Sequence, residues 1–136
     1  MGRIAYVNGR FVPHGDAFVH IEDRGYQLAD GVYEVVPVLH GKLIDEALHL
    51  DRLDFSLNEL MIDPPMERAA LQLVLREVLR RNGIGRGILY MQVTRGVAPR
   101  DHKFPRKVRP ALVMTAKRLK PIPVKYLEEG VGVITL

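Results

Sequence analysis

The sequence predicts an α+β fold in which a mainly antiparallel sheet has two helices packed on it. Three observations support this fold class: a hairpin signature near the N-terminus, two amphipathic helical patterns in the middle of the chain, and two apolar strands after them. A sheet built in this order is typical of domains whose helices gather on one face of antiparallel strands.

The first element is a β-hairpin. The apolar segments 4–7 and 10–12 flank Asn8-Gly9, a dipeptide that favours a type I′ turn because both central residues need positive φ. A loop over 13–16 and a short strand over 17–21 are expected to follow.

Residues 22–36, EDRGYQLADGVYEVV, join a charged, glycine-containing loop to an apolar strand that should extend over 32–39. A tight loop that leads into a rigid strand can hold a functional side chain in a fixed place. Tyr33 is the candidate, because it has an aromatic body and a hydroxyl donor. The alternative is a half-buried strand tyrosine that only packs.

Pro37 in this strand lacks a backbone donor, so it should lie at a sheet edge, a bulge or a strand end. His40-Gly41 then turns the chain into a short strand over 42–44.

Two helices are expected next, over 46–61 and 66–81. Asp45 can cap the first helix, and Asn82-Gly83 is a suitable stop for the second. Each helix has one apolar face. These faces consist of Leu50, Leu53, Leu57 and Leu60 in the first helix, and Leu71, Val74, Leu75, Val78 and Leu79 in the second.

Two more strands, over 87–94 and 111–116, complete the expected sheet. The polar loop between them, 95–108, is long enough to be of the kind that usually carries function.

The C-terminal segment suggests a domain boundary. Pro121-Ile122-Pro123 is typical of a stiff linker, and 131–136 is an apolar strand with no later element to cover it. We therefore expect an N-terminal domain over 1–118, with a linker and the first strand of a truncated C-terminal domain over 119–136. One domain whose last strand pairs with the first sheet is the alternative.

Composition excludes several classes of function. The chain has no cysteine, hence no disulfide, thiolate metal site or cysteine nucleophile. It has neither a long apolar run nor a signal-peptide core, so no membrane partner and a cytoplasmic location are expected. The net charge of +4 is scattered among acids, which argues against nucleic acid. No metal is expected, because no ligand spacing relates His14, His20, His40, His49 and His102.

Three segments together resemble one enzyme family: residues 22–36 above, ALHLDRL at 47–53 and YMQVTRGVAPRDHKFP at 90–105. Their order and spacing resemble the class IV (fold-type IV) pyridoxal-phosphate-dependent aminotransferases, most closely the D-amino acid aminotransferases. The resemblance covers essentially the whole chain and implies the N-terminal domain of that fold. It also implies pyridoxal 5'-phosphate as cofactor, a homodimer, and D-amino acids and 2-oxo acids as substrates.

The resemblance places the lysine that binds the cofactor beyond Leu136, so the chain alone should be inactive. No lysine within the chain is expected to replace it, because each lies in a turn, a linker or a basic loop rather than in an apolar pocket. The lysines concerned are Lys42, Lys103, Lys107, Lys117, Lys120 and Lys125.

The resemblance also assigns the site residues. Arg52 matches the arginine that binds the cofactor phosphate, a role for which a guanidinium offers a planar, permanently charged fork. The alternative is a surface ion pair along the helix. Against it, no acid stands three or four residues away, where the chain has Leu48, His49, Phe55 and Ser56. Arg100 and His102 match an Arg-x-His pair that holds the substrate carboxylate, with Tyr33 as a third donor.

Several alternatives remain open. A branched-chain L-amino acid aminotransferase and an aminodeoxychorismate lyase belong to the same class, although Arg100-x-His102 favours the D-amino acid enzymes. A non-catalytic module that dimerises or binds anions is the alternative outside the enzymes. A lysine soon after Leu136 in the reading frame would exclude the module.

Overall fold

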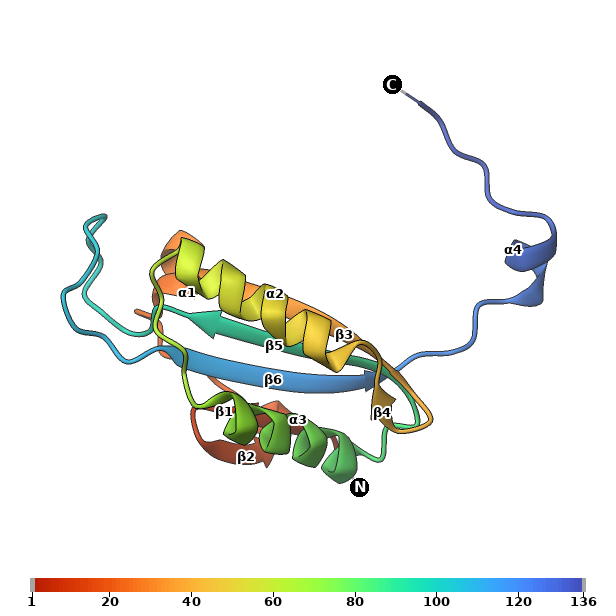
Figure 1. The fold of residues 1–136 in the computed structure, drawn as a ribbon, viewed down its shortest axis with the longest axis horizontal. Coiled ribbons are helices and arrows are strands. Elements are labelled where there is room, and N and C mark those ends of the chain that lie inside the picture. The colour runs from red at the N-terminus through yellow and green to blue at the C-terminus, as the bar shows by residue number, and fades with distance from the viewer. Residues whose placement is uncertain (1, 136) are drawn as a thin grey trace.

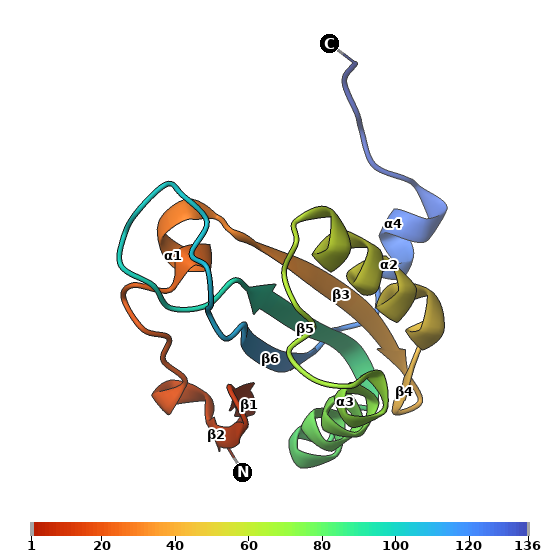
Figure 2. The ribbon, with the colours of Figure 1, turned by 60° about the vertical axis from the view of Figure 1, so that its left-hand side comes forward.

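A computed structural model describes residues 2–135 as a sheet covered on one face by helices (Figures 1 and 2). The sheet is antiparallel with the order β2-β1-β6-β5-β3-β4, so the expected fold class is confirmed. The strands are β1 (Ile4–Val7), β2 (Arg10–Pro13), β3 (Gly31–Leu39), β4 (Lys42–Leu43), β5 (Arg86–Thr94) and β6 (Ala111–Arg118). The helices are α1 (Arg24–Leu28), α2 (Glu46–Glu59), α3 (Arg68–Asn82) and α4 (Val124–Glu128), with a 3₁₀ turn at His14–Asp16.

The hairpin between β1 and β2 forms as predicted. Asn8 and Gly9 have φ values of +46° and +97°, which are the positive values that a type I′ turn needs. Asn8 also joins the hairpin to β6, because its side-chain Oδ1 accepts from the N–H of Leu112 at 2.8 Å.

One hydrophobic core lies between the sheet and helices α2 and α3. The predicted apolar faces form most of the helical side, although Leu60 is partly exposed at the end of α2. The strand side chains alternate between this core and the opposite, open face of the sheet. The strands contribute Tyr6, Val36, Val38, Leu89, Met91, Val93, Leu112, Met114 and Ala116 to the core.

Pro37 is accommodated because its missing donor faces away from β5. The backbone oxygen of Pro37 accepts from Ile44 N–H at 2.9 Å, on the β4 side of β3. The nitrogen and oxygen of one strand residue point the same way, so the absent N–H costs no bond in the β3–β5 ladder.

The segment before β3 differs from the prediction. Residues 17–20 form no strand, and the stretch that was expected to be a loop contains the short helix α1. The Asp23 carboxylate caps this helix by accepting from the N–H groups of Gly25 and Tyr26. Gly25 is required at this position, because a Cβ there would collide with the side chain of Thr94.

Asp45 stands at the predicted start of α2, but its side chain makes no capping hydrogen bond. Its φ of +52° is left-handed, a conformation in which it ends the turn from β4.

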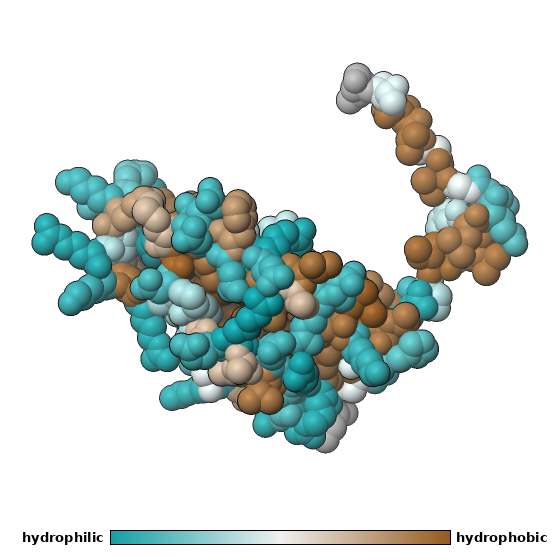
Figure 3. Space-filling model, in the orientation of Figure 1, coloured by the Kyte–Doolittle hydropathy of each residue, from teal (hydrophilic) through white to brown (hydrophobic). Residues whose placement is uncertain are grey.

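The C-terminal segment leaves the sheet after β6 and runs outward through α4 (Figure 1). Residues 131–135 have no regular structure, so the predicted strand is not formed by the part of it that the structure describes; Leu136 lies outside the described residues. The apolar side chains of this segment are exposed, as the brown surface in Figure 3 shows. No helix within residues 2–135 is long and apolar enough to cross a membrane.

Candidate functional site

Strand β3 presents two adjacent polar side chains on opposite faces of the sheet. Tyr33 points to the open face and is 64% exposed, whereas Glu34 points to the helix-covered face and is 2% exposed. Because successive side chains of a strand alternate, this short segment places one polar side chain on each face of the sheet.

Glu34 is held by two side chains of α2. Arg52 donates to it through two hydrogen bonds, Nε to Oε1 at 2.7 Å and Nη2 to Oε2 at 2.6 Å. Nδ1 of His49 lies 2.7 Å from Oε2. The acid partner of Arg52 is therefore not on its own helix but on the neighbouring strand β3.

The electrostatics of this cluster favour a carboxylate and a guanidinium that both stay charged. Burial opposes ionisation of Glu34, but the hydrogen bonds from Arg52 and His49 outweigh it and lower the pKa of Glu34. Glu34 in turn raises the pKa of Arg52, and nearby Tyr33 adds to this effect.

Arg52 keeps capacity for an external anion. A guanidinium has five N–H donors. Within residues 2–135 Arg52 makes only the two hydrogen bonds to Glu34, so the other donors are unused there. The Arg52 side chain is 64% exposed, so these donors face solvent. Glu34 thus fixes the orientation of the guanidinium without consuming its ability to bind an anion.

The open face beside Tyr33 is lined by aromatic and amide groups of β5. The rings of Tyr33 and Tyr90 stack at 5.8 Å, and the Tyr90 hydroxyl donates to Oε1 of Gln92 at 2.7 Å. Burial raises the pKa of Tyr90, with a further contribution from Tyr33. The stacked ring of Tyr90 therefore supports the ring of Tyr33.

The predicted functional loop connects β5 to β6 beside α1 (Figure 2). Its hydrophilic side chains project from the surface at the left of Figure 3. Arg100 and His102 are exposed there, and their side chains form no hydrogen bond or ion pair with any residue in 2–135. Both side chains are therefore available to an anion.

The loop is closed at its base by tight backbone packing. Gly96 has a φ of +104°, and a Cβ at this position would collide with the backbone oxygen of Arg109. Only glycine satisfies both conditions without strain. A second glycine, Gly31, lies against the Val93 oxygen where β3 enters the sheet.

Not all predicted site residues meet within one chain. Tyr33 and Arg52 lie close together, on either side of Glu34. Arg100 and His102 belong to the same end of the sheet, since the Tyr33 and Gln92 positions pair just before the loop begins. Among residues 2–135, however, Tyr33 makes no hydrogen bond to either of them.

Glu34 and His49 are the site residues that sequence reasoning missed. A signal for Glu34 existed, because strand alternation puts it on the same face as Val36 and Val38. A carboxylate on an apolar, buried face requires a cationic partner. No comparable signal marked His49.

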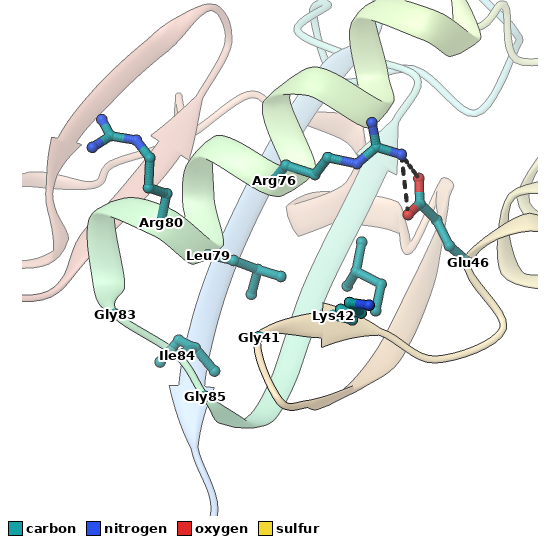
Figure 4. A pocket seen from close by; sticks show the side chains of 10 residues that line it. Gly41, Lys42, Glu46, Arg76, Leu79, Arg80, Gly83, Ile84 and Gly85 are labelled. Atoms are coloured by element: carbon teal, nitrogen blue, oxygen red, sulfur yellow. Dashed lines mark hydrogen bonds and ion pairs between the residues drawn. The ribbon is translucent and has the colours of Figure 1, made fainter.

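A hollow at the C-terminal end of α3 lies away from these residues. This pocket of about 620 Å³ opens at the far end of β3, where the β3–β4 turn meets the end of α3 (Figure 4). The ion pair between Arg76 and Glu46, at 3.2 Å, crosses its wall. It is lined by Gly41, Lys42, Leu43, Glu46, Arg76, Leu79, Arg80, Gly83, Ile84 and Gly85. None of the predicted site residues lines it.

Comparisons with known proteins show the family to which this chain belongs. The amino-transferase class IV family profile matches residues 31–134. A D-alanine aminotransferase from Staphylococcus haemolyticus is 39% identical over 132 residues, which is 96% of this chain. The chain spans only 46% of that relative's length.

Two solved structures share the fold. The 4-amino-4-deoxychorismate lyase of Pseudomonas aeruginosa superposes with a TM-score of 0.76 at 26% identity, over 93% of this chain and 44% of that one. The T.th. branched-chain amino acid aminotransferase with pyridoxamine 5'-phosphate gives a TM-score of 0.82 at 17% identity, over 90% of this chain and 42% of that one.

Proposed function

Because this chain belongs to the class IV aminotransferase family, we propose that it is the N-terminal part of a pyridoxal-phosphate-dependent D-amino acid aminotransferase. The enzyme exchanges an amino group between a D-amino acid and a 2-oxo acid. The observation that carries the proposal is the 39% identity to a D-alanine aminotransferase across nearly the whole chain. The proposal keeps the domain boundary at 118/119, since β6 ends at Arg118. It assigns the lysine that binds the cofactor to the second domain on the family resemblance alone.

Arg52 is the proposed contact of the cofactor phosphate. Its unused donors face solvent and its orientation is fixed by Glu34, so the residues present fit a phosphate group. When bound, pyridoxal 5'-phosphate supplies an electron sink for the carbon that loses its proton. The contribution of this chain is to hold the phosphate end and to bind the substrate.

Tyr33, Arg100 and His102 are the proposed donors for the substrate carboxylate. A carboxylate in a desolvated pocket needs several hydrogen bonds, because an unpaired buried charge is very costly. All three side chains are exposed, and neither Arg100 nor His102 is engaged by residues 2–135. They do not meet Tyr33 within one chain, which favours a homodimer in which each loop completes the partner's site.

The alternatives within the class have weaker support. The lyase is similar at 26% identity, against 39% for the D-alanine aminotransferase. The branched-chain enzyme shares the fold at 17% identity, which carries no substrate information. A cytoplasmic location remains part of the proposal, since a cysteine-free chain suits a reducing compartment.

The test is a substrate comparison with the full-length protein. The purified protein should carry pyridoxal 5'-phosphate and should transfer the amino group of D-alanine to a 2-oxo acid much faster than that of L-leucine. Preferential turnover of L-leucine, or release of pyruvate from aminodeoxychorismate, would replace the proposal by the corresponding alternative. A full-length protein without cofactor or turnover would support the non-catalytic module.

A further inference from the structure

A buried ionic cluster lies directly beneath the loop between β5 and β6. Arg24 and Arg95 both donate from Nε to Oδ2 of Asp30, at 2.7 and 2.8 Å. Arg24 is 3% exposed and Arg95 is 9% exposed. Burial opposes ionisation of Asp30, but the two arginines outweigh it and lower its pKa. The cluster therefore contains two cations for one anion. The N–H donors of the two arginines that do not bind Asp30 need other hydrogen-bond acceptors.

Arg24 uses its second donor to hold the loop. Its Nη1 donates to the backbone oxygen of Asp101 at 2.7 Å, across 77 positions of sequence. Asp101 is the residue between Arg100 and His102, so the bond holds the backbone between the two residues whose side chains are the proposed donors. The carboxylate of Asp101 also turns back to accept from the N–H of Lys103 at 3.2 Å.

Backbone contacts tie the same two segments together on either side of this bond. The N–H of Arg24 donates to Gly96 O at 2.9 Å, and the N–H of Ala98 donates to Glu22 O at 3.3 Å. The guanidinium of Arg95 lies 4.4 Å from the ring centre of Phe104, further along the loop. The base of the loop thus has several contacts, whereas Arg24 supplies the hydrogen bond at the Arg100–His102 tip.

We propose that Arg24 is a positioning residue for substrate carboxylate recognition, which it serves by holding the Asp101 carbonyl between Arg100 and His102. The inference rests on the proposed function. Lysine cannot replace Arg24, because the two acceptors lie at different edges of a rigid guanidinium, whereas a lysine has a single nitrogen. Arg24 itself touches no substrate in this proposal.

The test compares Arg24→Lys with wild type in the full-length enzyme, with Arg76→Lys as a control. Arg76 is also a paired arginine, but its partner Glu46 lies at the opposite end of the sheet. In R24K, trypsin should cleave after Arg100 and Lys103 faster than in wild type. The KM for D-alanine should rise about ten- to hundredfold, the range for a lost hydrogen bond to a charged group. R76K should change neither measurement.

A substrate without a carboxylate separates positioning from general damage. The reaction of the bound cofactor with a simple primary amine, followed by its absorbance change, should have the same rate in R24K and wild type. Equal losses with the amine and with D-alanine would overturn the inference, as would unchanged trypsin cleavage or an unchanged KM. If R24K does not fold, Arg24→Gln serves instead, because Asp30 keeps Arg95 as its ion-pair partner.

A wild-type enzyme that is inactive on D-alanine refutes the proposed function and the inference together, whereas an active wild type with an unaffected variant refutes the inference alone.

Discussion

Arg52 and Glu34 form a forked ion pair across the contact between α2 and β3, with hydrogen bonds of 2.7 and 2.6 Å. In this pair Arg52 is largely exposed, whereas Glu34 is buried. The guanidinium is therefore oriented from within the protein while its outer edge stays available for an anion.

Replacing Arg52 by alanine should weaken cofactor binding in the full-length enzyme. The loss of a charge-assisted contact to phosphate corresponds to about 1.5–3 kcal/mol, or roughly ten- to hundredfold in cofactor affinity. The relative rates with different D-amino acids should stay the same. Cofactor retention during dialysis measures the effect, and Arg80→Ala, an exposed paired arginine on α3, is the control. Unchanged retention in the Arg52 variant would make this arginine a structural residue only.

Replacing Glu34 by glutamine should reduce the pH dependence of stability. The folded-state pKa of Glu34 lies below its ordinary value of 4.5, so between the two values the unfolded chain binds more protons. The stabilisation is complete above the ordinary value and is lost as the pH falls through the folded-state pKa. Near neutral pH the variant should be less stable by about 1 kcal/mol, a figure reduced for the solvent exposure of Arg52.

Urea unfolding of the chain near neutral pH and at about pH 3 measures this effect. The difference between the two conditions should be smaller in Glu34→Gln than in wild type. The exposed residue Glu128 on α4 provides the matched control, Glu128→Gln, which should behave as wild type. An equal pH dependence in all three proteins would contradict the prediction.

Replacing Arg100 by alanine should raise the KM for D-alanine far more than it lowers cofactor affinity, because Arg100 is proposed to bind the substrate carboxylate and not the cofactor. A mixture of this variant with a variant that lacks the cofactor-binding lysine tests the shared site. In a hybrid dimer, one site combines an intact lysine with an intact loop from the partner, so part of the activity should return. Confirmed hybrids without any recovery would mean that each site is built within one subunit.

The 136-residue chain alone should not transaminate. All six of its lysines are exposed, so none lies in the apolar pocket in which an imine-forming lysine is expected. Borohydride treatment with pyridoxal 5'-phosphate should leave no stoichiometric label on one lysine, by mass spectrometry of tryptic peptides. A single labelled lysine together with D-alanine turnover would disprove this expectation.

Local chemistry predicted much of this fold. The Asn8-Gly9 turn and the two apolar helical faces depend on nearby residues, and each formed where expected. The segment 17–21 looked like a strand, but β-structure needs a pairing partner, and residues 17–20 have none. Helix α1 has only five residues, too few for a periodic pattern, and it depends on the Asp23 cap.

The ionic contacts of the site could not be predicted in the same way. Helical spacing relates Arg52 only to positions on its own helix, whereas its partner Glu34 stands 18 residues away on a strand. The contact from Arg24 to the Asp101 oxygen spans 77 positions and ends on a backbone atom. Every residue has such an oxygen, so the type of residue at this position does not predict the contact. Tertiary packing alone brings such groups together.

The contacts of Arg95 set a condition for exchanging the loop between β5 and β6. This residue donates to the Leu60 and Met61 oxygens at the end of α2, at 2.7 and 2.9 Å, as well as to Asp30. A loop transplanted from a homologue between Gly96 and Arg109 would thus be supported by three regions of the host. These regions are Arg95 at the end of β5, Asp30 before β3, and the end of α2. Exchanging the matching α1 segment and the end of α2 along with the loop should give chimaeras in which the loop keeps its conformation. Loops from different homologues could then be used in protein engineering.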